Sequence, residues 1–122
     1  MSRSGDVLAG CTILIVEDEP LIALEVHDAF REVGAITVAA SDAEEAQRMA
    51  HSPGLSAAVV DINLGDGDCS SVCQLLAKLS IPFVFYTADV RADILRRWPQ
   101  VPVLTKLAGK ERILEVVASV LR

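Results

Sequence analysis

Short apolar runs alternate with segments of helical periodicity along most of this 122-residue chain. Five runs are apolar almost throughout, which is typical of strands that are buried on both faces of a sheet. They cover residues 12–16, 36–40, 57–61, 82–87 and 101–105. Because helical segments separate these runs, the pattern predicts an α/β fold with a parallel sheet and helices on both of its faces.

The first predicted helix has clear signals at both ends. It begins at Pro20, a residue suited to the first helical position, and ends at Gly34, which favours the conformation that stops a helix. Four apolar residues are expected to form its inward stripe: Leu21, Leu24, Phe30 and Val33.

Four more helices are expected further along the chain. Ser41 and Glu44 form a capping box that opens a helix to about residue 50. A turn-rich loop over residues 65–68 then leads into a helix whose apolar residues recur at helical spacing. A shorter helix ends before Pro99, and the last one starts at about Lys110.

The totals limit the classes of protein that need to be considered. The length fits one domain, predicted over residues 11–122, and residues 1–10 are expected to form a flexible N-terminal tail. A net charge of −6 argues against direct binding of nucleic acid or of an anionic membrane. No apolar run approaches the roughly 20 residues of a membrane span.

Two weaker signals concern export and metal binding. Residues 8–11 spell a lipoprotein cleavage box, but the apolar stretch of a signal peptide is missing before it, so we expect a cytoplasmic protein. The three cysteines form no CxxC pair and are expected to be small buried or half-buried residues. His27 and His51 stand alone on predicted helices and are expected at a surface or interface.

Polar residues used in phosphoryl chemistry follow four of the five predicted strands. Glu17 and Asp18 follow the first, Asp61 the third, Thr87 the fourth and Lys106 the fifth. Because the carboxyl ends of parallel strands meet at one edge of the sheet, these side chains are expected to share a shallow pocket. The pattern indicates a site for a divalent cation and a phosphoryl group. Glu19, beside the acid pair, is expected to be a favourable acid at a helix start.

This set of residues resembles the receiver domain of two-component response regulators, over essentially all of residues 11–122. The resemblance implies a flavodoxin-like (βα)5 fold, a doubly wound parallel sheet with strand order 2-1-3-4-5 and a site at the switch point. It also implies a direct Mg²⁺ ligand in Asp18, a metal-bound water held by Glu17, and a further ligand in the main-chain carbonyl of Asn63.

Each residue of this expected site has a physical role. The ionised Asp61 is the expected phosphoacceptor, and it would form an acyl phosphate. Three neighbouring carboxylates need a cation, and Mg²⁺ prefers such hard oxygen ligands. The metal and Lys106 would neutralise the phosphoryl oxygens, while the Thr87 hydroxyl would donate a hydrogen bond to one of them.

The chain departs from the family pattern at several positions. Leu107 follows the lysine where proline is usual, and Val103 stands where many receivers carry an aromatic switch residue. The fourth strand, residues 82–87, resembles an atypical subfamily of mostly stand-alone receivers with a PFxFxTG-type strand. That resemblance implies a signal carried by ordering of residues 90–98. Asn63 and Asp89 are expected to flank the path of the hydrolytic water.

These features lead to a functional hypothesis with one main alternative. The chain is expected to be a phospho-accepting switch, with self-dephosphorylation but no other enzymatic activity, that receives its phosphoryl group from a histidine kinase or phosphotransfer protein. It ends just after the last predicted helix, so output is expected through an unidentified downstream protein or a homodimer; a fragment of a longer regulator would look the same. The alternative is a pseudo-receiver, a binding module that is not regulated by phosphorylation.

Overall fold

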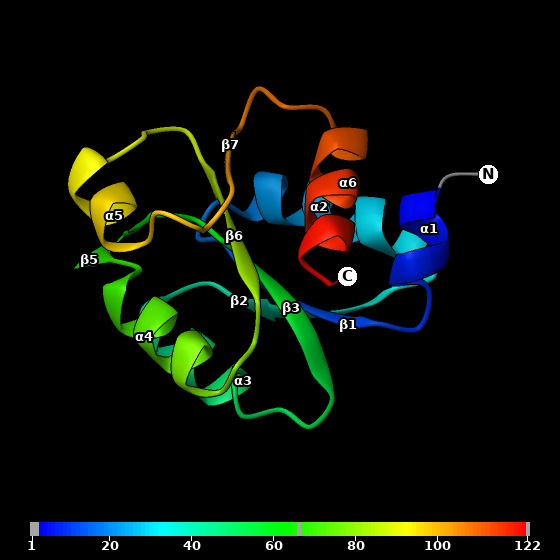
Figure 1. Cartoon of the computed structure of the whole chain (residues 1–122), viewed down its shortest axis with the longest axis horizontal. Helices are drawn as coiled ribbons and strands as arrows, with labels where there is room; N and C mark the ends of the chain where they lie inside the picture. Colours follow the sequence, from blue (N-terminus) through cyan, green and yellow to red (C-terminus); the bar gives the residue numbers. More distant parts are fainter. Residues whose placement is uncertain (1–2, 66, 122) are drawn as a thin grey trace.

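The structure is a computed structural model of the chain and describes residues 3–65 and 67–121. At its centre lies a five-stranded parallel sheet with the order β2-β1-β3-β6-β7 (Figure 1). Its strands are β1 (Thr12–Val16), β2 (Ile36–Ala40), β3 (Leu55–Val60), β6 (Phe83–Thr87) and β7 (Val103–Thr105). Counted among themselves, these five strands have the predicted order 2-1-3-4-5, which confirms the flavodoxin-like fold.

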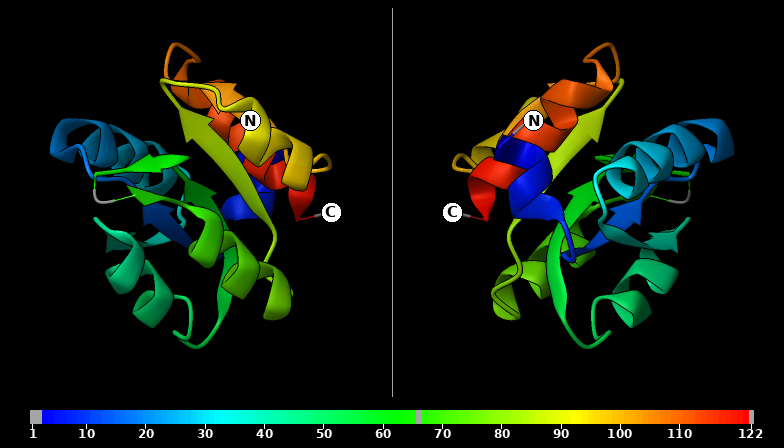
Figure 2. Two further views of the ribbon diagram at one scale, coloured as in Figure 1. Left: turned by 90° about the vertical axis from the view of Figure 1, so that its left-hand side faces the viewer. Right: turned by 90° about the vertical axis from the view of Figure 1, so that its right-hand side faces the viewer.

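In the part of the chain that the structure describes, six helices cover the two faces of this sheet. They are α1 (Arg3–Leu8), α2 (Pro20–Glu32), α3 (Ala43–Met49), α4 (Ser70–Lys78), α5 (Ala92–Arg97) and α6 (Lys110–Val120). Figure 2 shows α1 beside α6 on one face and α3 beside α4 on the other. None of the helices described is long and apolar enough to cross a membrane.

The strands build two separate hydrophobic cores because successive side chains point to opposite faces of the sheet. On β1, Ile13 and Ile15 pack into the core under α1, α2 and α6. Leu14 and Val16 pack into the core under α3, α4 and α5. All four side chains are almost completely buried, so both faces of β1 are covered.

The N-terminal segment differs from the prediction of a flexible tail. Residues 3–8 form α1, and Leu8 at its end is completely buried. The segment is tied to the end of α2, because the amide of Gly10 donates to the carbonyl of Gly34 at 2.9 Å. The prediction failed since six residues are too few to show a helical period, although Leu8 and Val7 pack the helix against the core. Residues 1 and 2 lie outside the described chain.

The predicted inward stripe of α2 is half wrong. Leu21 and Leu24 are 76% and 53% exposed, whereas Val26 and Phe30 are buried. The buried residues continue the spacing that starts at Ile22, which also packs against this core. The prediction failed because the spacing of Leu21 and Leu24 to Phe30 does not place them on one helical face.

Smaller differences concern one helix start and one loop. The cap of α3 is shifted by one residue from the predicted Ser41 and Glu44: Asp42 accepts from the amide of Glu45, and Glu45 accepts from the amide of Ser41, both at 2.7 Å. The loop after β3 contains two short antiparallel strands, β4 (Asn63–Leu64) and β5 (Gly67–Asp68).

The cysteines and histidines are mostly placed as expected. Cys69 and Cys73 are free and completely buried, and Cys11 is half-buried, which confirms their prediction as small apolar residues. His51 is exposed. His27 is only 9% exposed, so it lies on the buried face of α2 and not on the open surface.

Candidate functional site

The expected site residues lie at or just beyond the carboxyl ends of four strands. Three of them continue the backbone ladder of the sheet, because their amides donate to carbonyls of the neighbouring strands. These hydrogen bonds, all 3.0 Å long, join Glu17 to Ala40, Asp61 to Val16 and Lys106 to Thr87. The sheet therefore fixes the backbone from which each reactive side chain leaves.

The ammonium group of Lys106 joins carboxylates from two other strand ends. Its Nζ atom lies 2.7 Å from Oε1 of Glu17, 3.0 Å from Oδ2 of Asp61 and 2.8 Å from Oε1 of Glu19. The contact with Glu17 is an ion pair without good hydrogen-bond direction, since Oε1 has no hydrogen-bond partner among the described residues. Only 10% of the lysine side chain is exposed.

Burial and charge act against one another at these groups. The pKa of Glu17 is raised to about 7, because the effect of burial and of the neighbouring Asp61 carboxylate outweighs the opposing effect of Lys106. Burial alone would lower the pKa of Lys106, but its contacts with Glu17, Glu19 and Asp61 outweigh this and hold the pKa above its usual value. The lysine is therefore a permanent cation in a pocket that is short of positive charge.

The other acidic residue, Asp18, lies on the exposed rim of the site. Its Oδ2 atom accepts a hydrogen bond from the amide of Gly65 at 2.9 Å. Asp61, which is buried, accepts from the amide of Asn63 through Oδ1 at 3.2 Å. Residues 63–65 thus pass close to both carboxylates, and Asn63 lines the same pocket as Asp18 and Asp61.

Thr87 also lines the pocket. Its side chain is completely buried, and its hydroxyl donates to the carbonyl of Asp89 at 3.2 Å. The same oxygen accepts from the amide of Asp89 at 3.3 Å. The hydroxyl is therefore coupled directly to the backbone two residues further on.

The six predicted site residues lie close together, and five of them line the same pocket. Asp18, Asp61, Asn63, Thr87 and Lys106 line one pocket of about 290 Å³. Glu17 lies beneath it, with its carboxylate turned to Lys106. Glu19, expected only as an acid at a helix start, also lines the pocket and contacts the lysine. Its place three residues after Val16 was the signal that could have added it to the set.

The pocket has the donor groups that Mg²⁺ requires. Carboxylate oxygens of Glu17, Asp18, Glu19 and Asp61 lie within 4.8 Å of one another. Four carboxyl groups surround a single ammonium, so the pocket is short of positive charge, which a divalent cation with a preference for oxygen would supply. The residues present fit the ion that the sequence predicted.

The two departures at Lys106 and Val103 have different consequences. The lysine reaches the site although leucine follows it and although no peptide bond in the described chain is cis. Val103 is half-buried and packs among the apolar residues under α5, so no aromatic ring occupies that position. On β6, the phenol of Tyr86 donates a long hydrogen bond of 3.4 Å to the carbonyl of Lys106.

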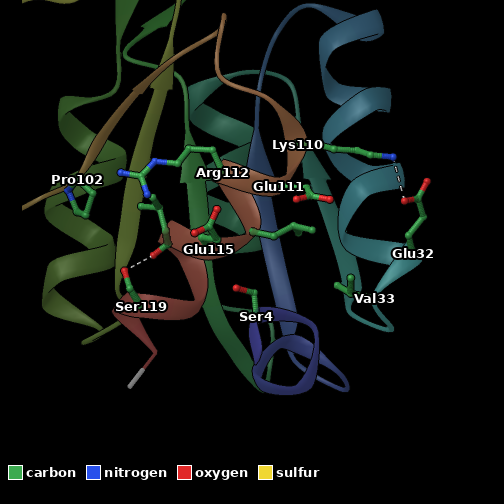
Figure 3. Close-up of a pocket in the computed structure, with 11 residues that line it drawn as sticks. Ser4, Glu32, Val33, Pro102, Lys110, Glu111, Arg112, Glu115 and Ser119 are labelled. Carbon is green, nitrogen blue, oxygen red and sulfur yellow. Dashed lines mark hydrogen bonds and ion pairs between the residues drawn. The ribbon is translucent and has the colours of Figure 1, made fainter. Parts of the chain in front are cut away.

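A larger hollow of about 760 Å³ lies elsewhere, between α1, the end of α2 and the outer face of α6 (Figure 3). Its rim carries acids and bases in alternation, and Lys110 is already paired with Glu32 at 3.2 Å. None of the predicted site residues lines it. The pocket at the strand ends is therefore the candidate functional site.

Comparison with known proteins places this geometry in a family. A family model for the response regulator receiver domain matches residues 13–118. The chain belongs to this family. The search among curated proteins found no match to this chain.

Solved structures show the same fold at low sequence identity. A response regulator receiver protein from Sinorhizobium medicae WSM419 is 21% identical, with a TM-score of 0.82 over 92% of this chain and 94% of that one. A CheY-like receiver domain from Methanospirillum hungatei JF-1 is 19% identical, with a TM-score of 0.83 over 93% and 94%. The PhyR response regulator REC domain of Erythrobacter litoralis is 24% identical, with a TM-score of 0.75 over 93% and 91%.

Proposed function

We propose that this receiver domain accepts a phosphoryl group on Asp61 from a histidine kinase or a phosphotransfer protein, with Mg²⁺ bound beside it. The observation that carries the proposal is the position of Lys106. Its ammonium lies 3.0 Å from the Asp61 carboxylate inside a pocket that also presents Asp18 and Thr87. A nucleophile, a fixed cation and a hydroxyl donor therefore surround one small volume.

The reaction forms one bond and breaks one. A carboxylate oxygen of Asp61 attacks the phosphorus of a phosphohistidine and forms an acyl phosphate. The phosphorus–nitrogen bond breaks, and its electron pair returns to the imidazole nitrogen of the donor. Asp61 suits this role because the ladder bond from its amide to Val16 fixes its backbone at the floor of the pocket.

The neighbouring residues stabilise the charge on the transferred group. Lys106 neutralises a phosphoryl oxygen, and it needs no proton transfer because its pKa is held high by the carboxylates around it. Asp18, Asp61 and the main-chain carbonyl of Asn63 would hold Mg²⁺, with Glu17 behind them. When bound, the ion supplies further positive charge next to the phosphoryl oxygens.

Thr87 provides a route for the signal to leave the site. A donation from its hydroxyl to a phosphoryl oxygen requires release of the Asp89 carbonyl, which it now contacts at 3.2 Å. Release changes the backbone just before α5, so the chain after Thr87 would report phosphorylation. Output is then a change in protein–protein contact, with a downstream protein or a second copy as the receiver of the signal.

The surface around the pocket supports a protein as the phosphodonor. Leu107, next to Lys106, is 96% exposed, and Leu21 and Leu24 on α2 are also largely exposed. Contact between Lys106 and Glu19 brings the start of α2 against the loop that carries Leu107. Apolar side chains that border a charged pocket are typical of a protein interface with a polar centre.

The activity proposed is that of a switch in the cytoplasm, without a catalysed turnover of small molecules. Incubation with Mg²⁺ and acetyl phosphate is expected to add one phosphoryl group, which intact-mass spectrometry detects. The Asp61→Asn variant is expected to stay unmodified, and Asp89→Ala, which keeps the acceptor, is expected to be modified. Absence of an Asp61-dependent adduct with both acetyl phosphate and beryllofluoride would leave the pseudo-receiver as the better explanation.

A further inference from the structure

A second set of polar contacts lies outside the phosphoacceptor pocket and joins the two loops that border it. One loop carries β4 and β5 after Asp61, and the other follows Thr87 and leads into α5. The guanidinium of Arg91 lies 3.5 Å from Oδ2 of Asp68, and the side-chain amide of Asn63 donates to the carbonyl of Asp89 at 3.4 Å. Two tethers thus connect the loops that border the pocket.

Asp68 links the contact with Arg91 to the expected metal site, because it pairs with Asn63. It stands directly opposite Asn63 in the antiparallel pair of β4 and β5. Its other oxygen, Oδ1, accepts from the amide of Ser70 at 2.9 Å, so the aspartate is fixed at the start of α4. A residue that holds Asp68 therefore also holds the strand on which Asn63 lies.

The hairpin of β4 and β5 also contacts two acids of the pocket, Asp18 and Asp61. The amide of Gly65 donates to Asp18, and the amide of Asn63 donates to Asp61. Residues 63–65 are consequently held between the acids of the pocket and the tethers to the loop after Thr87. Movement of either boundary changes the position of Asn63 relative to Asp18 and Asp61.

Arg91 is itself fixed on the side of α5. It forms two hydrogen bonds with Asp93, at 2.8 and 3.3 Å, and about a third of its side chain is exposed. Since Asp93 belongs to the first turn of α5, the guanidinium bridges the helix and the hairpin. No catalytic contact is assigned to Arg91, which does not line the pocket.

We propose that Arg91 is a positioning residue for the metal site: through Asp68 it holds Asn63 in place for Mg²⁺ and links occupation of the site to the position of α5. The inference rests on the proposed function, because it needs Mg²⁺ at Asp18, Asp61 and Asn63. The link is reciprocal, so an ion that fixes the hairpin also stabilises α5, and loss of the tether weakens both.

The direction in which one substitution changes the affinity for Mg²⁺ separates a positioning role from a simple charge effect. Arg91→Gln removes a positive charge near an acidic pocket, and charge alone would make Mg²⁺ bind more tightly. Loss of the tether has the opposite effect. We expect the dissociation constant for Mg²⁺ to rise roughly two- to fivefold, the range that a partly exposed ion pair supports.

Two further variants serve as controls in the same titration. Arg91→Lys keeps the charge and the ion pair, and is expected to stay within about twofold of the wild type. Arg96→Gln removes the same charge at an exposed residue of α5 outside the tether, and is expected to leave the affinity unchanged or slightly higher. Calorimetric titration of the full chain with Mg²⁺ alone gives these constants.

A metal-free measurement tests the tether directly. In Arg91→Gln, amide hydrogen exchange at Gly65 and Cys69 is expected to accelerate, because their bonds to Asp18 and Ile62 hold the hairpin closed. In the wild type, Mg²⁺ is expected to slow exchange in α5, and this effect is expected to shrink in Arg91→Gln. Unfolding in urea, expected to be nearly unchanged, identifies a variant that has simply lost stability.

The outcomes distinguish the role of Arg91 from the proposed function of the site. Tight Mg²⁺ binding by the wild type, lost in Asp18→Asn, together with unchanged or tighter binding by Arg91→Gln, would overturn the role of Arg91 and leave the proposed function standing. A wild type that binds no Mg²⁺ would overturn both. Weaker binding by Arg91→Gln, with rescue by Arg91→Lys and no effect of Arg96→Gln, supports the inference.

Discussion

The ammonium of Lys106 lies 3.0 Å from Oδ2 of Asp61, although the family's usual proline is missing after the lysine. Three carboxylates around one ammonium supply the attraction that fixes the side chain. The ladder bond from the lysine amide to Thr87 fixes its backbone. The position of the lysine is therefore determined by charge and by the sheet, and the residue that follows it is free to differ.

Replacement of Lys106 by methionine is expected to separate chemistry from metal binding. Phosphorylation by acetyl phosphate should slow roughly ten- to hundredfold, because the cation opposite the phosphoryl oxygens is gone. Binding of Mg²⁺ should be as tight as in the wild type or tighter, since a competing cation has been removed. Rates from intact-mass spectrometry and affinities from calorimetry check both parts. Lys110→Gln, at an exposed pair with Glu32, should change neither.

The exposed Leu107 is expected to matter only for a protein donor. Leu107→Asp should reduce transfer from a phosphorylated histidine kinase about tenfold, because an apolar contact beside the pocket becomes charged. Phosphorylation by acetyl phosphate should be unchanged, since the side chain is 96% exposed and faces away from the core. Radiolabel transfer assays measure the first rate and mass spectrometry the second. Equal slowing of both reactions would show that the substitution damages the pocket instead.

The completely buried Leu8 is expected to contribute strongly to stability. Leu8→Ala should lower the free energy of unfolding by about 2–5 kcal/mol, the usual cost of such a truncation in a packed core. Leu107→Ala, a matched change at an exposed leucine, should cost less than about 0.5 kcal/mol. Urea denaturation measures both. Similar values for the two variants would mean that α1 does not pack on the folded domain in solution.

Stability is expected to depend on pH through His27. Burial lowers the pKa of His27, and the nearby Arg31 lowers it further, while Nδ1 of the ring has no partner among the described residues. The unfolded chain then binds a proton more readily than the folded one. This contribution to stability is complete above the ordinary histidine pKa of about 6.5 and is lost as the pH falls through it.

The measurement compares His27→Gln with the wild type across this range. The difference between their unfolding free energies should change between about pH 7 and 5, with a slope no steeper than about 1.4 kcal/mol per pH unit for one proton. His51→Gln, at an exposed histidine, should run parallel to the wild type. A constant difference between wild type and His27→Gln would contradict the prediction.

The strands and the site were predictable because their signals are local. β1 and β2 have the predicted bounds, since apolar runs bounded by polar residues identify buried strands. Strand ends of a parallel sheet meet at one edge, so Asp61 and Lys106 could be assigned to the same pocket before their distance was known. The carboxylates, the hydroxyl and the ammonium then indicated a divalent cation and a phosphoryl group as the ligands of this pocket.

The parts that were missed depend on contacts between distant residues. The helix before β1 is fixed by Leu8, whose burial cannot be read from six residues alone. The tether between Asp68 and Arg91 joins residues 23 positions apart in loops that show no periodicity. The role of Glu19 follows from its contact with Lys106, which only the folded sheet brings within 2.8 Å.

The ladder bonds at Glu17, Asp61 and Lys106 have a consequence for how the protein can diverge. The reactive groups take their positions from the sheet, and the loops beyond them contribute mainly the rim of the pocket. Exchanges in the loop after Lys106 can therefore reshape the rim and select a different partner while the reactive centre keeps its geometry. Partner choice and chemistry are encoded in separable stretches of this chain.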